Sequence, residues 1–151
     1  MNESIYKRIK ALPPLDDTVT KIQAICKNEN SSLNDLSQII EKDPMLTANI
    51  LRSANSPLYG FSREVTTISR AVALFGMATI RGFALSSAVK KSFKINLDPY
   101  GITSQDFLNI SIIQNALMYN WYSKINASEL AVLSPASFML EVGKIVISNE
   151  L

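Results

Sequence analysis

The chain has 151 residues, of which 47% are hydrophobic and 19% are charged, and this suits one globular domain with its own core. Its net charge of +2 does not by itself indicate a nucleic-acid-binding protein. It has no histidine and one cysteine, so it lacks the commonest general base, the commonest transition-metal ligand and an internal disulfide. The polar start, and the lack of a stretch approaching about 18 apolar residues, predict a cytoplasmic protein without a membrane span.

Apolar residues recur at helical spacing along nearly the whole first part of the chain. A short opening helix is expected to end before Pro13-Pro14. The polar residues expected to begin the helices that follow are Asp16 or Asp17, Ser32, Asp43 and Thr66 or Thr67. Gly76 is expected to end one helix and Met77 to begin the next.

A polar link from Asn96 to Gly101 divides the chain. Thr103 is then expected to begin a long helix that places Trp121 in the core. The apolar stretch from Ser128 to Ile147 predicts two helices that meet near Gly143. No convincing strand is found, so the predicted fold class is all-α, a compact multi-helix bundle. It is expected to form a single domain of residues 1–151, with parts 1–95 and 102–151.

The sequence offers no clear catalytic or metal-binding motif. Neither GxxxxGK[ST] nor GxGxxG occurs, and helix capping explains the acidic residues better than a metal site does. Cys26 lies on the apolar side of its helix and is expected to pack in the core. We therefore predict a protein that is not an enzyme and that uses no cofactor or metal.

Two segments are candidate partner-binding surfaces. The first is an apolar loop containing Leu58, Tyr59 and Phe61, which either packs back on the domain or docks on a partner. The second is a segment with five basic residues and no acidic one, either an ordinary solvated face or a surface for an acidic partner. Its basic residues are Arg70, Arg81, Lys90, Lys91 and Lys94. Nucleic acid is disfavoured because these bases spread over more than one helix face and lack interleaved aromatic residues.

Three consecutive motifs resemble the HDOD family of bacterial output domains, which are related to the HD metal-dependent phosphohydrolases. They read LPPLDDTVTKIQAI, LSQIIEKDPMLTANILRSANSPLYGF and VTTISRAVALFGMATIRGFAL. The resemblance runs from about Leu12 to Ile147. It implies an all-α fold of the HDOD and HD type and a role in signalling and regulation.

The resemblance also gives the missing histidines a meaning. The family often reads FWxHS and later GLLHDIGK, where this chain has FLNIS and FMLEVGK. Ile110 therefore stands at a metal-binding histidine position, and Leu140 and Glu141 stand at the His-Asp pair. The resemblance implies that Ile110 and Leu140 fill the former metal pocket. It also implies that the family's region continues past the segment at which this chain ends.

The leading hypothesis is a non-catalytic regulatory domain that contacts protein partners in a bacterial signalling pathway. The first alternative is a degenerate metal-dependent phosphohydrolase or nucleotide-binding domain. The second is nucleic-acid binding through the basic segment 65–97.

Overall fold

The computed structural model describes residues 3–10, 14–92 and 96–148, and these ranges contain helices and no strand. The all-α prediction is confirmed. The α-helices are α1 (Glu3–Lys10), α2 (Asp17–Lys27), α3 (Leu33–Ile40), α4 (Pro44–Ala54), α5 (Ile68–Ser92), α6 (Ser104–Tyr122), α7 (Leu130–Phe138) and α8 (Val142–Ile147). Two short 3₁₀ helices, η1 (Asp98–Tyr100) and η2 (Ala127–Glu129), precede α6 and α7.

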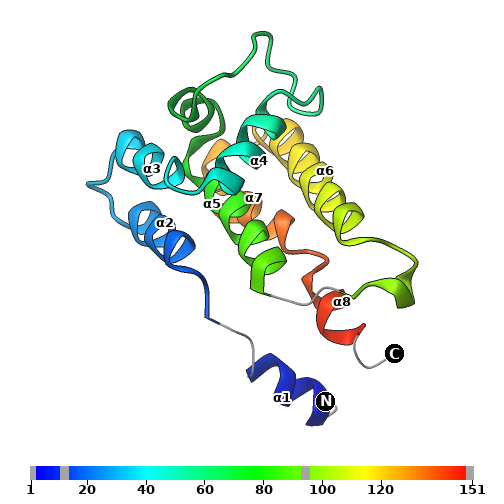
Figure 1. Ribbon diagram of the computed structural model, residues 1–151. Helices are drawn as coiled ribbons and strands as arrows, with labels where there is room; N and C mark the ends of the chain where they lie inside the picture. The colour runs from blue at the N-terminus through cyan, green and yellow to red at the C-terminus, as the bar shows by residue number, and fades with distance from the viewer. Residues whose placement is uncertain (1–2, 11–13, 93–95, 149–151) are drawn as a thin grey trace.

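The long helix α5 forms the centre of the bundle (Figure 1). It contacts α2, α3, α4, α6 and α7, while α1 lies at one end of the molecule and contacts α8. Its residues Val72 and Ile80 are fully buried in the main core, together with Ile22, Ile40 and Ile50 from the surrounding helices. The site described below is built around this central helix.

Hydrogen bonds confirm the helix starts predicted from polar residues. The capping side chains are those of Asp16, Ser32, Asp43, Thr67 and Thr103. Ser32 and Thr103 form reciprocal capping boxes with Asp35 and Asp106. These hydrogen bonds lower the pKa of both aspartates, because the charged carboxylate is the form that accepts them.

Two helix breaks that the sequence predicted are present in the structure. Gly76 interrupts α5 with a φ of 74°, a conformation that favours glycine, so the predicted break there is confirmed. The break in the last apolar stretch lies between Phe138 and Val142, and Gly143 is inside α8. The prediction of two helices that meet near Gly143 is therefore confirmed, with the turn at residues 139–141.

The buried face of α6 is formed by Phe107, Ser111, Asn115 and Ala116. Trp121 lies six residues after Asn115, about 240° further round the helix at 100° per residue. It is 60% exposed, so the prediction that it packs in the core is wrong. Cys26, in contrast, is half-buried against the main core, as predicted, and burial raises the pKa of its thiol.

A close approach of α5 and α7 depends on a glycine without a side chain. A Cβ atom on Gly82 would lie 2.2 Å from the Cδ2 atom of Phe138 and 3.2 Å from the Cα atom of Pro135. Since real Cβ atoms do not approach other atoms so closely, only glycine lets the two helices pack at this distance. This contact fixes the position of Phe138, which is 1% exposed.

A buried hydrogen-bond network joins α5, α6, α7 and the loop after α4. The Tyr59 hydroxyl donates to Asn115 Oδ1 at 2.9 Å. The Asn115 Nδ2 group donates to the Ser134 carbonyl and to the hydroxyls of Ser134 and Ser137. The Ser134 hydroxyl in turn donates to Thr79 Oγ1 at 3.1 Å. Asn115 is fully buried, so this network holds four segments together without access to water.

Two stretches have the length and composition of a membrane span, contrary to the sequence prediction that none approaches it. They are Ile68–Val89, with a mean hydropathy of 1.5, and Ala127–Ile147, with 1.7. The first belongs to α5, the core helix of the bundle. The second is divided among η2, α7 and α8 by a turn. Helix packing explains the apolar character of α5 in the structure.

Candidate functional site

The loop after α4 is closed by one asparagine. The Asn55 Nδ2 group donates to the Val65 carbonyl at 2.9 Å, and Asn55 Oδ1 accepts from the Val65 backbone N–H at 2.8 Å. Tyr59, inside this loop, is only 3% exposed, with its ring 4.8 Å from the ring of Phe75. The prediction that Tyr59 lies on a partner-binding surface is therefore wrong, because Tyr59 packs into the core of the domain. Leu58, the residue before it, is exposed.

Phe61 is half-buried and lines a hollow of about 430 Å³ beside Arg63 and Arg70. Both arginines are exposed, so this hollow brings together two residues of the predicted partner surface, Phe61 and Arg70. Arg81 lies further along α5 and is half-buried, and its Nη2 group donates to the Ala131 carbonyl at 2.7 Å. Arg81 therefore helps to hold the start of α7 against α5.

The remaining residues of the basic segment lie at the edge of the described structure. The side chains of Lys90 and Lys91 and the whole of Lys94 fall outside the described residues. Among the basic residues that are described there, Arg70 and Arg81 do not share one surface, because Arg81 turns to α7 while Arg70 faces the hollow beside the loop.

The three degenerate HD positions do not come together as a filled pocket. Ile110 is half-buried on α6, but Leu140 is 66% exposed in the turn between α7 and α8. The expectation that Leu140 fills the former pocket is wrong, because the buried side chain next to this turn is that of Phe138, two residues earlier. Within residues 3–10, 14–92 and 96–148, no group of three or more His, Cys, Asp or Glu side chains is placed to hold a metal ion.

Glu141 is held by neighbouring side chains. Its Oε1 atom accepts a hydrogen bond from Gln114 Nε2 at 2.9 Å, and its other oxygen forms an ion pair with Lys144. The hydrogen bond from Lys144, followed by that from Gln114, lowers the pKa of this carboxyl group. Glu141 therefore stays charged at neutral pH, with both oxygens engaged by groups from α6 and α8.

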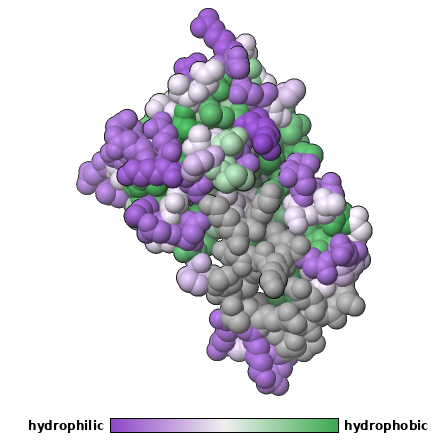
Figure 2. Space-filling view, viewed as in Figure 1, coloured by the Kyte–Doolittle hydropathy of each residue, from purple (hydrophilic) through white to green (hydrophobic). Residues whose placement is uncertain are grey.

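An exposed apolar stripe runs along α6. Ile113, Leu117 and Trp121 follow one another at intervals of four residues, which places them on one face, and they are 50%, 67% and 60% exposed. Leu58 lies next to the stripe, since it lines a hollow together with Ile113, and Asn120 Nδ2 donates to the Leu58 carbonyl at 2.7 Å. Figure 2 shows hydrophobic side chains at the surface among hydrophilic ones. We call Ile113, Leu117 and Trp121 the α6 stripe. The sequence prediction missed it, because their spacing fits a buried face equally well.

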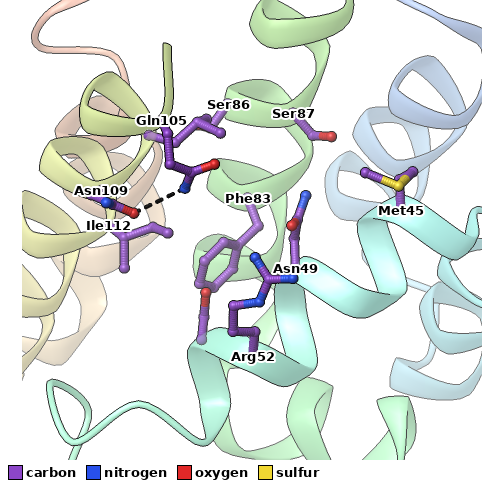
Figure 3. Close-up of a pocket in the computed structure, with 11 residues that line it drawn as sticks. Met45, Asn49, Arg52, Phe83, Ser86, Ser87, Gln105, Asn109 and Ile112 are labelled. Carbon is purple, nitrogen blue, oxygen red and sulfur yellow. Dashed lines mark hydrogen bonds between the residues drawn. The ribbon is translucent and has the colours of Figure 1, made fainter. Parts of the chain in front are cut away.

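A cleft of about 280 Å³ lies between α4, α5 and α6, on another side of α6. Each helix lines it with residues at helical spacing. They are Met45, Asn49, Arg52 and Ser53 from α4, Phe83, Ser86 and Ser87 from α5, and Gln105, Leu108, Asn109 and Ile112 from α6. In Figure 3, Arg52 and Asn49 face Gln105, Asn109 and Ile112 across Phe83.

The sequence did not single out the cleft residues. Arg52 belongs to the motif ILRSANS, but the residues of α5 and α6 that line the cleft with it are more than 30 positions away in the sequence. The one signal was Arg52 itself, the only charged side chain of α4, and a single arginine is also typical of a solvated face. The packing of α4 and α6 against α5 was needed to bring these residues together.

Comparisons with known proteins agree with this architecture. The chain is 21% identical to a crystal structure of a candidate metal-dependent phosphohydrolase from Shewanella amazonensis, over 92% of this chain and 52% of that one, with a TM-score of 0.67. An HDOD domain protein of unknown function from Geobacter sulfurreducens is 20% identical, over 95% and 49% of the two chains, with a TM-score of 0.60. At these identities the likeness shows the fold alone.

Two further comparisons give the extent of the match. A candidate phosphohydrolase from Shewanella amazonensis is 25% identical over 97% of this chain and 51% of its own, with a TM-score of 0.57. An uncharacterised protein of Treponema pallidum is 29% identical over 83 residues, which are 55% of this chain and 16% of that protein. The chain thus spans about half the length of these solved structures and a smaller part of the Treponema protein.

The family itself is matched over nearly the whole chain. The HDOD domain covers residues 12–151, which include every helix from α2 to α8. The chain therefore belongs to the HDOD domain family.

Proposed function

We propose that this HDOD domain is a non-catalytic regulatory domain that acts by contact with another protein. The proposal is supported by the side chains at the three positions where HD enzymes carry metal ligands. Ile110 and Leu140 have no metal-ligating atom, and the carboxylate of Glu141 is engaged by Gln114 and Lys144. HD-type hydrolysis needs metal ions that supply a bound hydroxide, and these side chains do not form a ligand set for them. We further propose a cytoplasmic role in a bacterial signalling pathway.

The phosphohydrolase alternative is tested by metal content and turnover. Purified protein is analysed for bound metals and assayed with bis-(p-nitrophenyl) phosphate in the presence of Mn²⁺, Fe²⁺ or Mg²⁺. We expect no stoichiometric metal and no turnover above that of the Glu141→Ala variant. Turnover that disappears in Glu141→Ala would establish the enzyme and refute the proposal.

The α6 stripe is the surface that best fits a protein partner. Three large apolar side chains that are at least half exposed at one face favour contact with another apolar surface over hydration. Aromatic residues such as Trp121 are enriched at such contacts. The proposed partner therefore presents an apolar patch of its own to α6.

A photo-crosslinking residue at Leu117 tests this surface in the native cell. The matched control carries the same residue at Glu29, which is exposed in the turn between α2 and α3. We expect one discrete crosslinked product of a different protein at Leu117, absent at Glu29 and lost with Trp121→Lys. Equal labelling at both positions, or a product containing only a second copy of this chain, would contradict the assignment.

A further inference from the structure

We propose that the cleft between α4, α5 and α6 binds a small organic anion, in which a phosphate or carboxylate group is carried on a body of about nucleoside size. This inference goes beyond the proposed regulatory role and does not depend on it, because none of the three residues of the α6 stripe lines the cleft, although Ile113 lines the hollow beside it. The cleft also differs from the degenerate HD positions. Gln114, which holds Glu141, lies two residues after the cleft residue Ile112, about 200° round the helix.

The anionic character of the ligand follows from Arg52. Its guanidinium group lines the cleft and forms no ion pair or hydrogen bond with another residue in the described part of the chain. None of the side chains that line the cleft is acidic. A guanidinium group with free donors matches a carboxylate or phosphate through two parallel hydrogen bonds. The positive charge of Arg52 therefore has no negative partner within the cleft, and an anionic ligand would provide one.

The polar body of the ligand is matched by amides and hydroxyls. Gln105 Nε2 donates to Asn109 Oδ1 at 3.1 Å, which orients both amides and leaves Gln105 Oε1 and Asn109 Nδ2 for other partners. Ser53 and Ser86 are 3% and 6% exposed, and both line the cleft. These donors and acceptors can form hydrogen bonds with the polar edge of a ring or with an amide group of a ligand.

The apolar part of the cleft sets the size of the ligand. Phe83 is 5% exposed and lies between α4 and Ile112 in Figure 3. Leu108 of α6 also lines the cleft. A second hollow of about 270 Å³ shares Arg52, Ser53, Asn109 and Ile112 with the cleft. The cleft volume of about 280 Å³ lies just below the range of roughly 300–1,000 Å³ for ligand pockets. A compact molecule therefore fits better than a dinucleotide.

Isothermal titration calorimetry on the whole chain at low salt tests the proposal. One arm uses the nucleoside monophosphates AMP, GMP, CMP and UMP, and the other uses the aromatic carboxylates benzoate and phenylacetate. We expect at least one anion to bind with a Kd below about 1 mM, and its uncharged parent nucleoside or amide to bind at least about tenfold more weakly. The arm that binds identifies the source of the anionic group.

Two variants and a control assign the binding to Arg52. Arg52→Gln is expected to weaken binding by roughly tenfold to a hundredfold, and Arg52→Lys by less, because lysine keeps the charge but not the planar fork. Arg70→Gln removes the same charge from an exposed residue outside the cleft and should leave the affinity within about twofold. The proposal is overturned if no anion in either arm binds below about 1 mM, or if Arg52→Gln and Arg70→Gln weaken binding equally.

Discussion

Asn115 provides the sharpest test of what holds the bundle together. The side chain is fully buried, and it accepts a hydrogen bond from Tyr59 and donates three to Ser134 and Ser137. In Asn115→Ala, the serine groups keep other partners, because the Ser137 hydroxyl still donates to the Ser134 carbonyl and the Ser134 hydroxyl to Thr79. The hydroxyl of Tyr59 is the one group of the network that loses its only partner in the described structure.

The lost hydrogen bonds set the magnitude. A buried hydroxyl left without a partner costs about 1–3 kcal/mol, and the lost amide hydrogen bonds add to it. We expect Asn115→Ala to lower the free energy of unfolding by about 3 kcal/mol. Tyr59→Phe keeps the ring against Phe75 but orphans Asn115 Oδ1, so we expect it to cost about 1–3 kcal/mol.

Urea unfolding of both single variants and the double variant measures the coupling. Removing both partners leaves no orphaned group at this contact, so the double variant should lose about 1–3 kcal/mol less than the sum of the two single losses. The slope of the unfolding free energy against urea should stay unchanged. Additive losses would refute the reasoning, since they would mean that Tyr59 and Asn115 do not depend on each other.

Three further predictions concern close packing, pH and the surface. Gly82→Ala should destabilise the fold by about 1–3 kcal/mol in thermal unfolding because its Cβ meets Phe138, whereas Gly143→Ala, with nothing within 4 Å of the added atom, should not. Burial raises the pKa of the Tyr59 hydroxyl above its ordinary value of 10.0, so the hydroxyl loses its proton at a lower pH in the unfolded chain than in the folded one. The free energy of unfolding should therefore fall as the pH rises above 10.0. Urea unfolding at each pH should show a smaller fall in Tyr59→Phe. Trp121→Ser should change the unfolding free energy by no more than about 0.5 kcal/mol, and a larger loss would show that its ring is buried by a contact within the chain.

The helices and their starts were predictable because local chemistry decides them. A polar side chain before an apolar stretch, as at Asp43, caps the backbone N–H groups that follow whatever the rest of the chain does. Gly76 is a local signal as well, since its positive φ disfavours other residues. The family motifs then indicated the HDOD fold, which periodicity alone leaves open.

The site was less predictable because it depends on which helix faces meet. Leu117 and Trp121 have the spacing of a core face, yet α6 is turned so that Asn115 faces the core. The sequence around Arg52 is typical of a solvated arginine until α6 places Asn109 opposite it. Leu140 shows the limit of matching a motif: a position can fit a family pattern while the turn that carries it points the side chain outward.

The bonds of Asn55 have a consequence for how this domain can vary. The side-chain amide of Asn55 joins the two ends of the loop, ten positions apart, because it bonds to both the carbonyl and the N–H of Val65, as a neighbouring β-strand would. The exposed residues Ser62, Arg63 and Glu64 between them can therefore change in number or type without moving α4 or α5. An insertion or substitution at this tip should thus leave the bundle beneath it unchanged.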